Sequence, residues 1–276
     1  MKTTPPHPVS FSTGNPPQLR LTAPTQWQGL PDEWLRYILF LMGNFQHSTA
    51  VKTLVVIRYN ALERPEKAQG GFWYSVSTTT PGQRGTTRRR VFIADWQMHE
   101  ATRALSFIDS VRGYQPLHTT AGLTAVNSRL HGVRFADYLQ CEKYWSAIAT
   151  AKETAPDPEK TTALFAAKLA QTLYLRRGRK AAKPPTLTKA EQLNVLLWYA
   201  AVRETFQEEF KHLFAPAGEN TAAPPFKETM NAQIRALTDG DPTKEQAVFD
   251  LDTWRALTEL NEKAREAAEI RKITSK

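Results

Sequence analysis

Apolar residues recur at the three-to-four-residue spacing of α-helices along most of the chain from Trp27 onward. The predicted helices cover residues 29–44, 47–65, 95–113, 133–153, 156–177, 186–214, 226–238 and 242–272. Thr188 and Glu191 form a T-x-x-E capping box near the start of the helix over 186–214. Because this helix is apolar on more than one side, we expect other helices to pack around it.

One part of the chain predicts β-structure instead. Residues 71–77 (GFWYSVS) and 89–94 (RRVFIA) are aromatic and β-branched, and a polar stretch separates them. We predict a hairpin with a long, mobile tip here, and an irregular connection over residues 113–132. The expected fold is therefore mainly α, a helical bundle-like domain with one β-hairpin in the N-terminal half.

The distribution of proline and glycine suggests how the chain divides into domains. Residues 1–24 contain repeated prolines and few apolar residues, which predicts a flexible N-terminal arm. An α-plus-hairpin subdomain is expected over 25–113 and a helical subdomain over 133–276. The alternative is one continuous domain over 25–276.

Composition limits the class of protein. The 276 residues are 41% hydrophobic and 23% charged, which is typical of globular proteins, and no stretch is long and apolar enough to suggest a membrane helix. The single cysteine, Cys141, excludes a disulfide framework, so we expect an intracellular chain. A net charge of +9 and an isoelectric point near 9.6 favour an acidic partner, or simply a cationic surface.

Two clusters of basic residues are the candidate contacts for nucleic acid or an acidic protein. The first lies in the polar stretch of the hairpin, and the second lies in a run without any acid between Lys160 and Lys189. The favourable interaction of cations with a helix C-terminus explains only part of the second cluster. The candidate residues are Arg84, Arg88, Arg89, Arg90, Arg176, Arg177, Arg179, Lys180 and Lys183. Without a recognition motif or an aromatic stacking platform, such contacts would reach only the nucleic-acid backbone.

Motifs for catalysis are missing from the sequence. No phosphate-binding glycine loop, nucleophile elbow or H-E-x-x-H zinc motif occurs, and the six histidines are scattered. Cys141 lies among apolar residues, which favours a buried structural thiol over a nucleophile. We therefore predict a non-enzymatic protein with no catalytic residue, no metal site and no cofactor.

Four aspartates near residue 245 resemble a calcium loop at first sight: Asp239, Asp241, Asp250 and Asp252. An EF-hand needs glycine at the sixth position of its loop, where this sequence has Lys244. The alternative is a junction between two helices, in which Asp241 or Thr243 caps the second helix. Asp250 and Asp252 then fall within that helix or at a break in it.

The order of several segments resembles an uncharacterised family encoded in tailed-phage and prophage morphogenesis regions. The similar segments are LPDEWLRY after a tryptophan, VKTLVVIRYNAL, VRFADYLQCEKYW, LYLRRGR and MNAQIRALTDGDPTKEQAVFDLDTWRALTELNEKA. The resemblance implies a non-enzymatic structural or assembly protein of a tailed phage or phage-like particle. It carries no functional residues onto this chain.

The resemblance to a phage morphogenesis family implies the partners and the location of the protein. The partners would be other particle proteins or a second copy of the chain, with no membrane span. The protein would act in the host cytoplasm during assembly, and the sequence leaves open whether it stays in the assembled particle. The alternative function is sequence-independent nucleic-acid binding through the basic loops.

Overall fold

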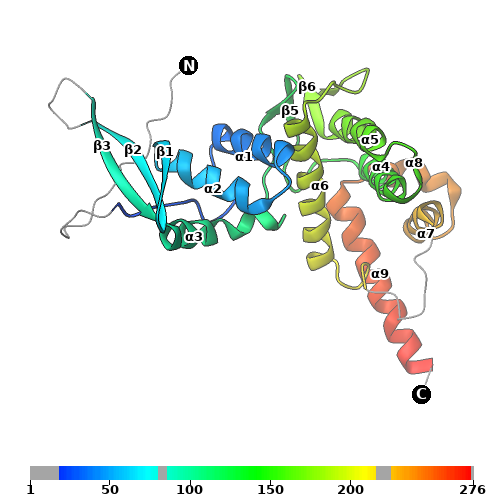
Figure 1. Ribbon diagram of the computed structural model, residues 1–276. Coiled ribbons are helices and arrows are strands. Elements are labelled where there is room, and N and C mark those ends of the chain that lie inside the picture. Colours follow the sequence, from blue (N-terminus) through cyan, green and yellow to red (C-terminus); the bar gives the residue numbers. More distant parts are fainter. Residues whose placement is uncertain (1–18, 80–85, 216–224, 275–276) are drawn as a thin grey trace. The chain divides into compact units, whose positions relative to one another are not determined.

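The structure is a computed structural model that describes residues 19–79, 86–215 and 225–274. The chain divides into two compact units, Met1–Gly113 and Tyr114–Lys276, so residues 114–132 belong to the second unit. The prediction of a mainly α chain is confirmed, although each unit also contains a small antiparallel sheet (Figure 1).

Unit 1 combines helices with a three-stranded sheet in the order β1-β2-β3. Its elements are α1 (Asp32–Asn44), α2 (Ser48–Tyr59), β1 (Leu62–Ala68), β2 (Gly71–Thr79), β3 (Thr86–Ala94), α3 (Asp95–Arg103) and the 3-10 helix η1 (Ala104–Asp109). β2 and β3 are the two strands of the predicted hairpin, so these strands are confirmed, whereas the predicted tip over 80–85 lies outside the described residues. A Cβ atom on Gly71 would lie 2.3 Å from the carbonyl oxygen of Ile93, so only glycine permits this close pairing.

The third strand was not predicted. The helix predicted over 47–65 ends at Tyr59, and the chain then turns through Ala61, which has a positive φ of 50°. β1 pairs with β2 through a bulge between Glu63 and Glu66, and Pro65 lies inside that bulge. A proline lacks the N–H that a regular ladder needs, so its place in a bulge of an edge strand is physically consistent.

The segment before α1 is attached to unit 1. Leu19 is buried in the core with Leu62, Tyr74 and other strand residues. The buried Asn60 accepts a hydrogen bond from the Thr22 backbone N–H (3.0 Å) and donates one to the Thr22 carbonyl (2.8 Å). Residues 19–24 therefore differ from the expected flexible arm, whose residues 1–18 lie outside the described part of the chain.

Unit 2 consists of helices around a small sheet in the order β4-β5-β6-β7. Its elements are β4 (Thr119–Thr120), β5 (Leu123–Ala125), α4 (Phe135–Thr154), α5 (Pro158–Leu173), β6 (Tyr174–Arg176), β7 (Arg179–Lys180), α6 (Lys189–Glu209), α7 (Phe226–Thr238), the 3-10 helix η2 (Pro242–Lys244), α8 (Glu245–Phe249) and α9 (Thr253–Thr274). The helix predicted over 156–177 was too long, because the chain becomes extended at Tyr174. The irregular segment predicted over 113–132 contributes β4 and β5.

α6 lies at the centre of the aromatic packing of unit 2, as expected. Its capping box is confirmed: the Thr188 backbone N–H donates to Glu191, and the Glu191 N–H donates back to the Thr188 hydroxyl. Along the helix, Trp198 packs against Tyr174 of β6 and Tyr199 against Trp145 of α4, while Phe206 contacts Tyr138 and Trp254. α6 thus joins β6, α4 and α9 into one core.

A buried amide holds the small sheet against α6. Asn194 is fully buried, and its carbonyl oxygen accepts hydrogen bonds from the Tyr114 hydroxyl and the Leu117 N–H, each at 2.9 Å. Its amide nitrogen donates to the Tyr174 hydroxyl (2.7 Å) and to the Thr120 hydroxyl (3.2 Å). The Asn194 side chain therefore forms hydrogen bonds with four other residues of unit 2.

The C-terminal helix predicted over 242–272 is interrupted between α8 and α9. Asp252 accepts hydrogen bonds from the N–H groups of Trp254 (2.9 Å) and Arg255 (3.3 Å), which caps α9. The other oxygen of Asp252 accepts from the Gly132 N–H at 2.6 Å, so the break is attached to the segment before α4. Within the described residues, no group of three potential metal ligands occurs, and Asp241 caps η2 as predicted.

We predict that Asn194→Leu lowers the free energy of unfolding of unit 2 by about 3 kcal/mol, because buried hydroxyl and N–H groups lose their partner. Urea unfolding followed by tryptophan fluorescence measures this change. Gln207→Leu, at an exposed position of the same helix, is the control and should change stability by less than about 0.5 kcal/mol. Equal stability of the two variants would contradict the role assigned to Asn194.

Candidate protein-interaction surface

The β1-β2-β3 sheet has large apolar side chains on both of its faces. Tyr74, Val76, Val91 and Ile93 point into the core, where Ile57 of α2 and Met98 of α3 pack near them. Side chains alternate between the two faces of a strand, so Trp73 and Phe92 point away from this core. These two rings belong to directly paired residues, and they remain 38% and 37% exposed.

Trp73 and Phe92 form a contiguous patch with charged neighbours. Their ring centroids are 5.3 Å apart, and the guanidinium of Arg90 lies 5.3 Å from the Trp73 ring in a cation–π contact. Arg90 also pairs with Glu66 of β1, the register partner of Trp73. Arg88 lies two residues before Arg90 in β3, on the same face. We call the following residues the sheet surface: Glu66, Trp73, Arg88, Arg90 and Phe92.

The residue types of the sheet surface are those of protein–protein contacts. Tryptophan, phenylalanine and arginine are enriched at the centres of such interfaces. Glu63 and Glu66 lie on the same face as the arginines, so the surface carries both signs of charge. Mixed charge around aromatic rings suits another protein better than it suits a uniformly anionic polymer.

The structure changes the placement of the first basic cluster. Arg88, Arg89 and Arg90 all lie in strand β3, paired with Ser77, Val76 and Ser75, so the strand begins earlier than the predicted Arg89 and includes Arg88. Arg89 belongs to the opposite face from Arg88 and Arg90, so the three residues do not form one patch. Arg84 lies outside the described residues.

The second cluster forms a hairpin in unit 2. β6 and β7 are joined by Arg177 and Gly178, whose φ values of 50° and 78° match a two-residue hairpin turn. The surrounding chain lines a depression of about 740 Å³. We call its cationic residues the basic hairpin: Arg176, Arg177, Arg179, Lys180 and Lys183. All five are exposed, and Lys180 is also paired with Asp137 of α4.

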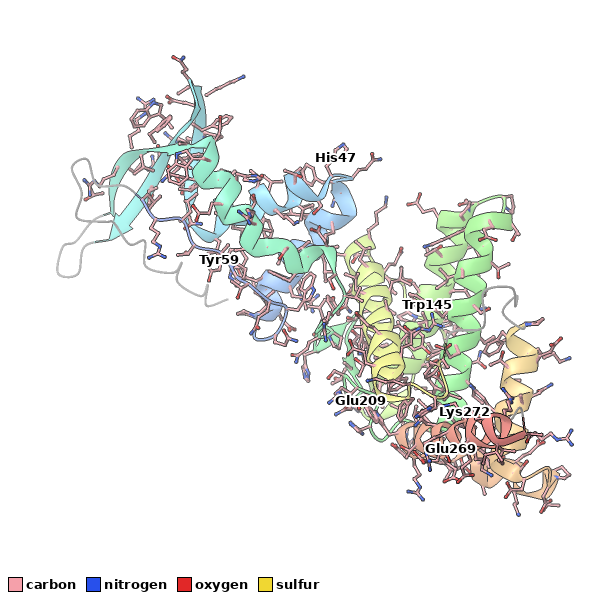
Figure 2. All side chains as sticks on the ribbon, turned by 90° about the horizontal axis from the view of Figure 1, so that it is seen from below. His47, Tyr59, Trp145, Glu209, Glu269 and Lys272 are labelled. Atoms are coloured by element: carbon pink, nitrogen blue, oxygen red, sulfur yellow. The ribbon has the colours of Figure 1, made fainter. Side chains whose placement is uncertain are left out.

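The cysteine, two histidines and a half-buried glutamate of the described residues lie in different surroundings. Burial, reinforced by the nearby carboxylates of Glu142 and Asp137, raises the pKa of the Cys141 thiol well above its usual value, which disfavours the reactive thiolate. His131 stacks on Trp254, with ring centroids 4.5 Å apart, and His47 lies exposed at the start of α2 (Figure 2). Glu142 accepts a hydrogen bond from the Tyr199 hydroxyl and forms an ion pair with Arg203.

Sequence reasoning missed the aromatic half of the sheet surface. The sequence does contain a pattern that indicates this surface: three consecutive large apolar residues occur in Phe72-Trp73-Tyr74 and again in Val91-Phe92-Ile93. A strand that buries only one face alternates apolar and polar residues, so such runs indicate two apolar faces. The strands therefore carry an exposed aromatic pair, Trp73 and Phe92, that the sequence analysis did not predict.

Comparisons with protein-family models, curated proteins and solved structures found no match. Among the described helices, none combines the length and apolar character needed to cross a membrane.

Proposed function

We propose that this chain is a non-enzymatic structural or assembly protein of a tailed phage or phage-like particle, acting through contacts with other particle proteins or with itself. The sheet surface is the observation that supports this proposal best. The resemblance of the segments around Trp27 and Asp241 to a morphogenesis family supplies the particle context.

Binding at the sheet surface would be driven by its two rings. Covering the exposed part of Trp73 and Phe92 removes roughly 70 Å² of each from water, which contributes about 2 kcal/mol per ring. Together they amount to about 4 kcal/mol, which corresponds to an affinity change of up to about a thousandfold. Arg90 contacts both the Trp73 ring and Glu66, so its guanidinium lies beside the ring that a partner would cover.

The end of α9 offers a second apolar surface in unit 2. Ile270 and Ile273 are 63% and 76% exposed, and the last turns of α9 extend beyond α6 in Figure 1. Glu269 and Lys272 alternate with these isoleucines on the same turns (Figure 2). A helix end with exposed isoleucines is suited to packing against a partner helix, as expected for an assembly protein.

We predict that Trp73→Ser combined with Phe92→Ser reduces binding to the particle partner at least tenfold, since both rings leave the contact. The full chain would be co-expressed with the proteins encoded beside it, and co-purified proteins would be quantified by mass spectrometry. Trp96→Ser is the matched control, because Trp96 is a tryptophan of α3 that is 63% exposed and lies outside the sheet surface. Equal recovery with all variants, or no particle protein with the native chain, would contradict the proposal.

Sequence-independent nucleic-acid binding remains a second candidate function, favoured by the basic hairpin. Arg176, Arg179 and Lys183 present cations around one depression, and the hairpin contains no acid. Contacts of this kind neutralise phosphates and release counterions, so they weaken steeply as salt rises.

If this second function holds, the chain binds random-sequence duplex DNA at low salt, and replacing Arg176, Arg179 and Lys183 by serine makes the salt dependence shallower by about two to three units of log–log slope. Fluorescence anisotropy at several salt concentrations measures the slope. The matched control replaces Lys211, Arg255 and Arg271, three exposed cations elsewhere in unit 2. Absence of binding at low salt would eliminate this function.

A further inference from the structure

Three helices of unit 2 form a groove whose cavity measures about 580 Å³. α4, α7 and α8 contact one another in pairs, and each helix presents one stripe of side chains to the groove. We call this the unit 2 groove, and its lining residues are Arg134, Ala136, Leu139, Gln140, Lys143, Phe226, Lys227, Met230, Gln246, Phe249 and Asp250. Because it lies wholly in unit 2 and shares no residue with the sheet surface, it is a different site from the contact proposed above.

The lining follows helical spacing on every wall. Ala136, Leu139 and Lys143 are three and four residues apart on α4, and Phe226 and Met230 are four apart on α7. Leu139 is buried, whereas Phe226, Met230 and Phe249 are half-buried and form an apolar floor. Such a floor between helices suits the apolar face of a further helix, with side chains at i, i+3 or i+4, and i+7.

The rim of the groove is cationic. Arg134, Lys143 and Lys227 are exposed cations, and Asp250 is the one carboxylate of the lining. Asp250 is already occupied, because it accepts hydrogen bonds from Arg134 (3.3 Å) and from Gln246 (2.9 Å). No ion pair within the described residues involves Lys143 or Lys227, so both are available to an incoming acid.

We propose that the unit 2 groove binds an acidic amphipathic helix of a partner protein. The apolar floor takes the partner's large apolar side chains, and Lys143 of α4 and Lys227 of α7 pair with glutamates or aspartates flanking that apolar face. The cationic rim also repels basic helices, so the groove selects its partner by charge as well as by shape.

Selection from a displayed peptide library tests this inference on the full chain. The library consists of 18-residue helical peptides with large apolar residues at i, i+4, i+7 and i+11, and with glutamate, lysine or serine at each flanking position. Peptides enriched on the native chain should carry glutamate at the flanks and bind at least tenfold more tightly than their lysine versions, as measured by fluorescence anisotropy.

Charge reversal provides the matched control without touching the core. In Lys143→Glu combined with Lys227→Glu, both at exposed positions, the preference should switch to lysine at the flanks. A second variant, Met230→Asp, should lose both classes of peptide, and its circular dichroism spectrum should match that of the native chain.

Three results would overturn the inference: no enrichment on the native chain, enrichment of lysine or serine peptides, or a preference unchanged by the charge reversal. Analytical ultracentrifugation of the native chain tests the remaining alternative, in which a second copy of this chain occupies the groove. A dimer that Met230→Asp converts to a monomer would assign the groove to a second copy of this chain and would also overturn the inference.

Discussion

A β-strand can bury only alternate side chains against one layer of helices, and this constraint determines which aromatic residues of unit 1 stay exposed. Tyr74, Val76, Val91 and Ile93 fill the core on one face of the sheet. Trp73 and Phe92 are next to these core residues in their strands and therefore face outward, and the register places the two rings on the same face. The exposed apolar surface on which the functional proposal rests is therefore a direct result of how the core is packed.

Unit 2 depends on two polar side chains that fix irregular segments. Asn194 joins the residues around β4 and β6 to α6, and Asp252 caps α9 while it accepts a hydrogen bond from Gly132. The break at Asp252 also ends α8 after five residues, which places α8 beside α4 and α7 instead of continuing into α9. The unit 2 groove is a consequence of that break.

Much of the helical structure follows from local signals in the sequence. The capping box of Thr188 and Glu191 and the Asp157 cap of α5 are local hydrogen-bond patterns, so sequence alone could place them. β1 could not be placed in this way, because its sequence LERPEKA is polar and contains a proline, and β5 could not because it pairs with β6, far along the chain. The same limit explains why Trp73, Phe92 and Arg90 could not be recognised as neighbours before the strand register was known.

The most direct test of the central claim is photo-cross-linking from the sheet surface inside assembling particles. Ser75 pairs with Arg90 beside Trp73, and a benzoylphenylalanine at this position would leave both rings intact. The account predicts that irradiation joins the chain to one particle protein, or to a second copy of itself, with the linked peptide identified by mass spectrometry. Cross-links only to nucleic acid, or no cross-link while particles form normally, would contradict it.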